Sequence, residues 1–384
     1  MLNLNVPGTD PVLKQSTETR PKAVSAWLDR LPFSIPTEAA QQLVMALYAL
    51  NRQQLDAAER TALLTLYRPV VARAVASLEA MLAESGVPPS PQMRQTGALL
   101  RELHIEHSYG YKQVLLSLIN RRFGRPNPKY LAEASTRLLA VLRDIQAACY
   151  LTYSPLPAGL WQELHQVYQF ALSTGLADDA GEDAPPASRA YCQALLTALA
   201  DPPHMNPAQL ALTQIYLSKF ASLAVLAPVT ANPPKPGFLI TVKADRPPGQ
   251  LSVNPEEGDL WLCTEALCRH LHETGQRLRA GDTPRQAGLP HGMESEPSKA
   301  LLKRLLKLWG NSAQRVFKRH ARPGETMQLV AGLGAIHRLL DPSPPASADD
   351  TDTDNHLQIR CVETTPAAPL AAPAPPQITQ WSII

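Results

Sequence analysis

Residues 232–242 read Asn-Pro-Pro-Lys-Pro-Gly-Phe-Leu-Ile-Thr-Val, and this stretch divides the chain into two parts of different character. Its proline-rich beginning predicts a linker, because proline lacks the amide hydrogen that helices and sheets require. Residues 238–242 are rich in branched side chains and lie between turn-forming residues, which predicts a β-strand. We therefore expect helices before this stretch and strands only after about residue 236.

The part before the linker has the spacing of amphipathic helices. Leu43, Leu47 and Leu50 recur at steps of four and three residues, so that one face of their helix is expected to be buried. Successive helical segments are separated by short breaks that contain proline or glycine. The sequence predicts a mainly α fold in which residues 21–228 form an antiparallel helical bundle or an α-hairpin array, after a flexible N-terminal arm at residues 1–20.

Local signals predict where two of these helices start. Thr37 is expected to cap one helix with its hydroxyl, and Asp56 and Glu59 are expected to form a capping box before a longer one. Apolar side chains of the opening helices are expected to share one core. They are Trp27, Leu43, Leu47, Leu63 and Leu64.

The part after the linker begins with a small α/β module, which we place at residues 229–309. Further short strands are expected at residues 251–253 and 259–263. Thr264 is expected to cap the helix that follows. A basic helix at residues 300–309 then leads into the last region of the chain.

Three arginines follow that basic helix at close spacing. Arg315 and Arg319 are four residues apart, and Arg322 lies shortly after them, before a strand start at residues 327–330. Each guanidinium presents several donors in a fixed fork that fits phosphate oxygens, and its flat face can stack on a purine. Clustered arginines also occur as a solvated basic face, and the spacing alone leaves both interpretations open.

The Arg-x-x-x-Arg pattern of Arg315 and Arg319 resembles the first half of the PilZ motif, which binds cyclic di-GMP. More broadly, the chain resembles long bacterial proteins that have a helical N-terminal region and a PilZ-like C-terminal domain. The resemblance implies that Arg315 and Arg319 hold the phosphates of cyclic di-GMP and stack on its guanines, with Arg322 as a third donor. The segments that carry the broader resemblance are residues 27–32, 50–55, 60–69, 160–165 and 332–337.

The second half of the PilZ motif, (Asp/Asn)-x-Ser-x-x-Gly, has no clear counterpart in the sequence. The segment from Asp341 to Ala346 begins in the same way, with Ser343 at the right position, but it lacks the glycine. We therefore expect residues 310–384 to be an incomplete PilZ-like β region with a Pro/Ala-rich insertion at residues 341–376, in a chain truncated before the second motif.

Composition and motifs bear on the other classes of function. The net charge of +2 gives no strong attraction to nucleic acid or to an anionic membrane. The five cysteines include no Cys-x-x-Cys pair, and no apolar run is long enough to span a membrane, which favours the cytoplasm. The sequence contains no Walker loop and no Gly-x-Ser-x-Gly. We therefore expect no enzymatic activity, no cofactor and no metal.

Histidines and aromatic residues offer two further candidate sites. His104 and His107 lie one helical turn apart and could share a metal ion, but no third ligand is evident, and a partly exposed polar helix face is the preferred interpretation. Trp161 and Tyr168 are expected to belong to the core rather than to a ligand-stacking site.

The resemblance implies a signalling or adaptor protein that responds to cyclic di-GMP and whose helical part is a scaffold for a protein partner. Two alternatives stay open. The first is a scaffold or adaptor that binds no ligand. The second is a helical RNA- or nucleotide-binding protein that uses the basic patch at residues 121–129.

Overall fold

The computed structural model describes residues 2–10, 18–84, 89–120, 127–179, 186–249, 255–294 and 296–310. These residues lie in one structural unit, Met1–Ala313. The three candidate ligand residues Arg315, Arg319 and Arg322 are outside the described residues.

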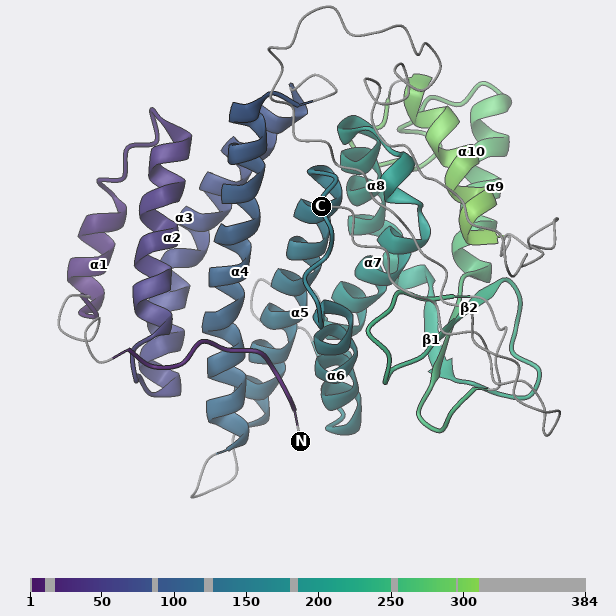
Figure 1. Ribbon diagram of the computed structural model, residues 1–384. Helices are drawn as coiled ribbons and strands as arrows, with labels where there is room; N and C mark the ends of the chain where they lie inside the picture. Colours follow the sequence, from purple (N-terminus) through teal and green to yellow (C-terminus); the bar gives the residue numbers. More distant parts are fainter. Residues whose placement is uncertain are drawn as a thin grey trace, which may run out of the picture. The chain divides into compact units, whose positions relative to one another are not determined.

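Long helices lying side by side make up the first part of the chain (Figure 1). Within this part, α4 packs against α2, α3 and α5. The predicted mainly α architecture is confirmed, and no described helix is long and apolar enough to cross a membrane. The helices are α1 (Pro21–Leu28), α2 (Pro36–Asn51), α3 (Ala57–Ala83), α4 (Pro91–Ile119), α5 (Pro128–Leu151), α6 (Leu160–Ser173), α7 (Ala187–Leu199) and α8 (Pro207–Phe220), with short 3-10 turns η2 (Pro202–His204) and η3 (Ala221–Leu223).

Capping residues start several of these helices. The capping box before α3 is confirmed, because the Glu59 amide donates to Asp56 Oδ1 at 2.7 Å and the Asp56 amide donates to Glu59 Oε2 at 3.4 Å. The prediction for Thr37 is wrong: α2 begins one residue earlier, at Pro36, and has no side-chain cap. Proline suits the first helical position because the amide hydrogen that it lacks would have no partner inside the helix.

The predicted core of the opening helices is confirmed for its four leucines. Leu43, Leu47, Leu63 and Leu64 are at most 1 % exposed and belong to one cluster of buried side chains. Trp27 is partly buried against the same cluster. Its ring centroid lies 6.3 Å from that of Tyr67.

Leu47→Ala should lower the free energy of unfolding by about 2–5 kcal/mol, because it removes a fully buried side chain and leaves a cavity. Urea denaturation followed by circular dichroism measures the loss. Met45→Ala on the same helix is the matched control, since Met45 is 71 % exposed. Equal loss in the two variants would contradict the assignment of Leu47 to the core.

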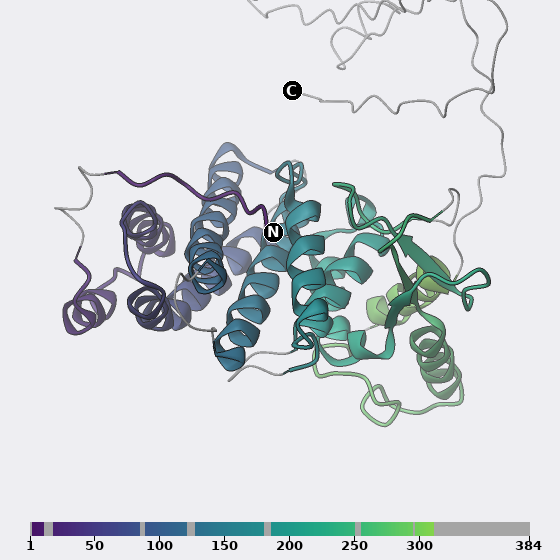
Figure 2. The ribbon, with the colours of Figure 1, turned by 90° about the horizontal axis from the view of Figure 1, so that it is seen from below.

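The N-terminal arm differs from the flexible segment that the sequence predicts. In residues 2–10, the amides of Asn3 and Asn5 donate to Gln166 Oε1 at 2.7 Å and to Glu163 Oε1 at 2.8 Å, and Leu4 is buried. Figures 1 and 2 show this purple segment crossing α4 toward α6. The segment is held by hydrogen bonds to α6 near its start and to the end of α2 at Asp10, whose amide donates to the Arg52 carbonyl at 2.8 Å.

A small antiparallel sheet follows the helices, with the strand order β1-β3-β2. Its strands are β1 (Val225–Pro228), β2 (Gly237–Ile240) and β3 (Leu260–Cys263). Two of the predicted strands are confirmed as β2 and β3, whereas residues 251–253 are outside the described residues. Two helices complete this part, α9 (Glu265–Arg279) and α10 (Glu296–Gly310).

Strand β1 corrects the expectation that strands begin only after about residue 236. Val225 pairs with Cys263, and Pro228 pairs with Leu260, so β1 lies along the whole length of β3. No local pattern predicts β1, because four residues are too few to establish an alternation, and the partner strand lies more than thirty residues away.

Candidate coupling site between the helices and the sheet module

The predicted ligand residues begin shortly after the last described helix. Helix α10 ends at Gly310, and Arg315 follows five residues later. The described part of the chain therefore shows how the segment leading to these arginines is attached to the helices, which is the geometry that bears on function.

The sheet itself is the first connection. Strand β1 follows η3 directly at the end of the helical part, whereas β2 and β3 lie beyond the linker at residues 232–236. The linker is held as well, because the Trp261 indole Nε1 donates to the Pro234 carbonyl at 2.8 Å. The Trp261 ring lies so close to Gly237 that a Cβ at position 237 would overlap the ring. Backbone pairing between β1 and β3 thus joins the two sides of the linker.

Asp245 makes the second connection by capping a helix that has no cap of its own. Helix α6 begins after Gly159, which has no side chain to accept a hydrogen bond. Asp245 Oδ2 accepts from the Gly159 amide at 2.7 Å, and its Oδ1 accepts from the amides of Trp161 and Gln162 at 3.0 and 3.3 Å. A carboxylate stabilises this position because the first amides of a helix lack intrahelical partners and carry partial positive charge.

The buried side chain of His165 makes the third connection. Its Nε2 donates to the Arg246 carbonyl at 3.2 Å, since a carbonyl oxygen can only accept, and its Nδ1 then accepts from the Tyr191 hydroxyl at 2.6 Å. Burial lowers the pKa of His165 to about 4, although the Arg246 carbonyl raises it in part. The ring is therefore neutral at neutral pH, with one fixed tautomer.

Helix α10 makes the fourth connection, at two points. The Arg304 guanidinium donates to the His204 carbonyl at 2.8 Å and forms an ion pair with Asp201 at 3.2 Å. Near the end of the helix, the fully buried Trp309 donates from Nε1 to the Leu196 carbonyl of α7 at 3.0 Å. Its ring centroid lies 6.1 Å from that of Tyr216 on α8. The end of α10 that leads to Arg315 is thus fixed against α7 and α8.

Thr264 does not cap α9 with its side chain, as the sequence predicted, but bonds to the end of α10. It does precede α9, but its hydroxyl makes no cap hydrogen bond to that helix. It donates instead to the Trp309 carbonyl at 2.7 Å, and it also lies 3.3 Å from the Pro236 carbonyl. The orphan carbonyl at the end of α10 is a competing acceptor that the local sequence does not reveal.

The remaining sequence candidates lie elsewhere in the helical part. His104 and His107 are only 5 % and 6 % exposed, so the prediction that they lie on a partly exposed polar face is wrong. They are buried because α4 packs against α2, α3 and α5. Burial lowers the pKa of both, that of His107 to about 3. The core assignment of Trp161 and Tyr168 is confirmed. Among the described residues, no group of three or more His, Cys, Asp or Glu could hold a metal ion.

The basic patch at residues 121–129 lies mostly outside the described residues, which include its exposed Lys129 but not Arg121, Arg122 or Arg125.

Sequence reasoning missed four residues that connect the helices to the sheet module: Asp245, His165, Arg304 and Trp309. Each acts through a partner far along the chain, and no local pattern marks such a pair.

Two family models match separate parts of the chain. Residues 22–231 match a family model described as the N-terminal domain of the cyclic-di-GMP receptor FimW, and residues 237–342 match its middle PilZ domain. The chain thus combines a helical domain with a PilZ domain. It belongs to the FimW family.

A curated relative, the cyclic-di-GMP receptor FimW of Pseudomonas aeruginosa, is 28 % identical over 349 residues, which cover 88 % of this chain and 56 % of the relative. The chain therefore spans little more than half the length of that relative. No solved structure matches the chain.

The matched ranges clarify the connections described above. The gap between them, residues 232–236, is the proline-rich linker. Strand β1 falls in the N-terminal match and its partner β3 falls in the PilZ match, so the sheet contains strands from both. The PilZ match covers residues 237–309 of the α/β module and residues 310–342 of the expected PilZ-like region.

Proposed function

We propose that this chain belongs to a cyclic di-GMP-responsive signalling protein, in which binding at the PilZ end changes how the helical domain engages a protein partner. Arg315 and Arg319 hold the phosphates and stack on the guanines of the ligand, and Arg322 is a third donor. The protein acts in the cytoplasm as a receptor and adaptor and not as an enzyme.

The attachment of α10 carries this proposal. Helix α10 lies in the range that matches the PilZ domain, as do all three arginines, and it ends five residues before Arg315. Trp309 and Arg304 fix the same helix to α7 and to the turn before α8. A ligand that repositions the arginine segment therefore pulls on a helix whose other contacts belong to the helical domain.

The relative's description supports the choice of ligand. FimW of Pseudomonas aeruginosa is described as a cyclic-di-GMP receptor. Paired guanidinium groups suit this ligand because it offers phosphate oxygens for the donor fork and purine faces for stacking.

Calorimetric titration of cyclic di-GMP into this protein tests the proposal. Arg315→Ala or Arg319→Ala should weaken binding about ten- to a hundredfold, because one charge-assisted hydrogen bond contributes roughly 1.5–3 kcal/mol. Arg315→Lys should also weaken binding, since lysine keeps the charge but loses the planar fork.

Arg285→Ala is the matched control, because Arg285 is an exposed arginine of the same module. Equal affinity in the wild type and in the Arg315→Ala/Arg319→Ala double variant would contradict the assigned site. No binding in any form would favour the scaffold without a ligand. Salt-dependent binding of RNA that is lost in Arg121→Ala/Arg122→Ala would favour the nucleic-acid alternative.

A further inference from the structure

The N-terminal arm has the alternating pattern of an extended chain that lies on a surface. Leu4 is 6 % exposed, and Leu2 and Val6 are partly buried, whereas the side chains of Asn3 and Asn5 are exposed. Figures 1 and 2 show this purple segment crossing α4 toward α6. Apolar side chains at every second position therefore hold the arm against the helical domain.

The arm is hydrogen-bonded to α6 through its main chain. The Asn3 amide donates to Gln166 Oε1 at 2.7 Å. The Asn5 amide donates to Glu163 Oε1 at 2.8 Å. Every residue except proline offers such an amide, so these two bonds do not depend on the side chains of the arm. Peptide-binding sites work in this way, with main-chain hydrogen bonds for affinity and alternate side chains for selectivity.

The acceptor Glu163 is held in place by a residue outside the arm. Its Oε2 lies 2.7 Å from Lys112 Nζ of α4, and the side chains of Glu163 and Lys112 are 10 % and 6 % exposed. This ion pair leaves Oε1 as the acceptor for an amide. Asp245 of the sheet module caps the start of the same helix, so the acceptors lie next to the coupling site. The surface therefore offers preorganised acceptors to an extended chain.

The surface continues beyond the arm. A groove of about 1,030 Å³ is lined by Leu2, by Phe170 and Leu172 of α6 and by Leu260 of β3. Within the described residues 2–10, only Leu2 lines this groove, and Leu172 is 47 % exposed. Exposed apolar surface beside a bound segment favours an occupant that is longer than the arm.

We propose that this surface of α4 and α6 is a docking site for an extended segment of a protein partner, which displaces the arm. The segment carries branched apolar residues where the arm has Leu2 and Leu4, and a further apolar residue ahead of them enters the groove at Phe170 and Leu172. Leu4 is the one buried side chain of residues 2–10, so the arm opens at low cost. The proposal rests on the proposed function in taking the helical domain as the part that engages a partner.

Fluorescence anisotropy with a labelled peptide of residues 2–10 tests the site on the whole protein, without cyclic di-GMP. Leu4→Asp in the protein releases its own arm, so this variant should bind the peptide at least tenfold more tightly than the wild type. Asn5→Pro, which removes the amide donor to Glu163, should act in the same direction. Asn3→Ala is the control, because the exposed side chain changes and the amide stays. Equal affinity in the wild type and in both arm variants, or no binding to any of them, overturns the proposal.

Changes in the peptide test how it is recognised by the Leu4→Asp protein. In the peptide, Leu4→Asp should abolish binding. Asn5→Pro should weaken it at least tenfold, whereas Asn5→Ala should change it little, because only proline lacks the amide. Adding Phe-Ser ahead of Leu2 should tighten binding about fivefold relative to adding Ser-Ser, since the phenylalanine enters the groove. Equal affinity for the two extended peptides overturns the proposed partner segment.

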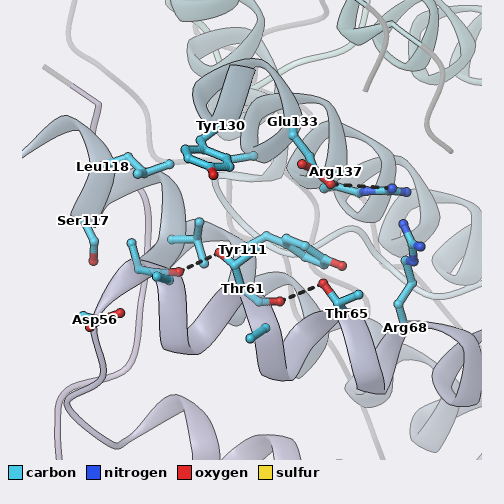
Figure 3. A pocket seen from close by; sticks show the side chains of 15 residues that line it. Asp56, Thr61, Thr65, Arg68, Tyr111, Ser117, Leu118, Tyr130, Glu133 and Arg137 are labelled. Carbon is cyan, nitrogen blue, oxygen red and sulfur yellow. Dashed lines mark hydrogen bonds and ion pairs between the residues drawn. The ribbon is translucent and has the colours of Figure 1, made fainter. Parts of the chain in front are cut away.

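Two pairs of results locate the bound peptide. Gln166→Ala should weaken its binding to the Leu4→Asp protein, whereas Gln162→Ala, which changes an exposed glutamine of the same helix, should not. The apolar groove between α3, α4 and α5 (Figure 3) is another place where an apolar peptide could bind. Ala62→Leu places a larger side chain in that groove and should leave the affinity unchanged. A loss with Ala62→Leu but not with Gln166→Ala overturns the site.

Cyclic di-GMP separates this proposal from the proposed function. Without it, the Arg315→Ala/Arg319→Ala variant should bind the peptide as the wild type does. Peptide binding that does not respond to cyclic di-GMP would reject the coupling and keep the docking site. Intact binding of cyclic di-GMP without peptide binding would reject the docking site alone.

Discussion

Trp309→Ala should lower the free energy of unfolding by about 3–5 kcal/mol, the usual cost of emptying a buried aromatic site. Trp309 is fully buried, its indole packs on Tyr216, and its Nε1 donates to the Leu196 carbonyl. The variant loses both the packing and the hydrogen bond, so α10 should become detached from α7 before the remaining helices unfold. Urea denaturation gives the total loss, and limited proteolysis near residue 310 reports the detachment.

Two other substitutions on α10 serve as controls for Trp309→Ala. Trp309→Phe keeps most of the packing but not the donor, and it should cost less than Trp309→Ala. Lys307→Ala changes an exposed side chain of the same helix and should stay within about 0.5 kcal/mol of the wild type. If Trp309→Ala were no worse than Lys307→Ala, α10 would not be fixed to the helical domain, and the proposed coupling would lose its structural basis.

Lys112→Met should cost about 3–5 kcal/mol, because it leaves the buried carboxylate of Glu163 without its charge partner. Lys112 Nζ lies 2.7 Å from Glu163 Oε2, and the two side chains are only 6 % and 10 % exposed. Burial lowers the pKa of Lys112, and Glu163 opposes that shift by charge and by hydrogen bonding. The pair joins α4 to α6, and the other carboxylate oxygen of Glu163 accepts from the Asn5 amide.

A double-mutant cycle separates the interaction energy of the Lys112–Glu163 pair from the cost of leaving the Glu163 carboxylate buried without its partner. The Lys112→Met/Glu163→Gln variant should recover most of the stability lost in Lys112→Met, because glutamine is neutral and still offers an oxygen to Asn5. Chemical denaturation of all four proteins gives the coupling energy. Additive losses in the two single variants would show that the pair contributes no interaction of its own.

Much of the helical domain could be predicted from the sequence, since its signals are local. The capping box of Asp56 and Glu59 satisfies amides within one turn, and the spacing of Leu43 and Leu47 marks one helix face. The three prolines of residues 232–236 lack amide hydrogens, which makes a continuous helix or strand there unfavourable. These features depend on neighbours along the chain, so the sequence could predict the helices and the linker, although it placed the first strand after the linker and missed β1. The contacts proposed for Arg315 and Arg319 remain predictions.

Only the tertiary structure decided how the two parts are joined. Asp245 caps α6 across 86 residues of sequence, and Trp309 reaches a carbonyl 113 residues earlier. β1 exists as a strand because β3 provides its hydrogen-bond partners, and Thr264 turns from its own helix toward the end of α10. His104 and His107 are buried because other helices enclose α4. Spacing along the sequence determines which face of an element is apolar, whereas the packing of distant elements determines what that face meets and which polar groups find their partners.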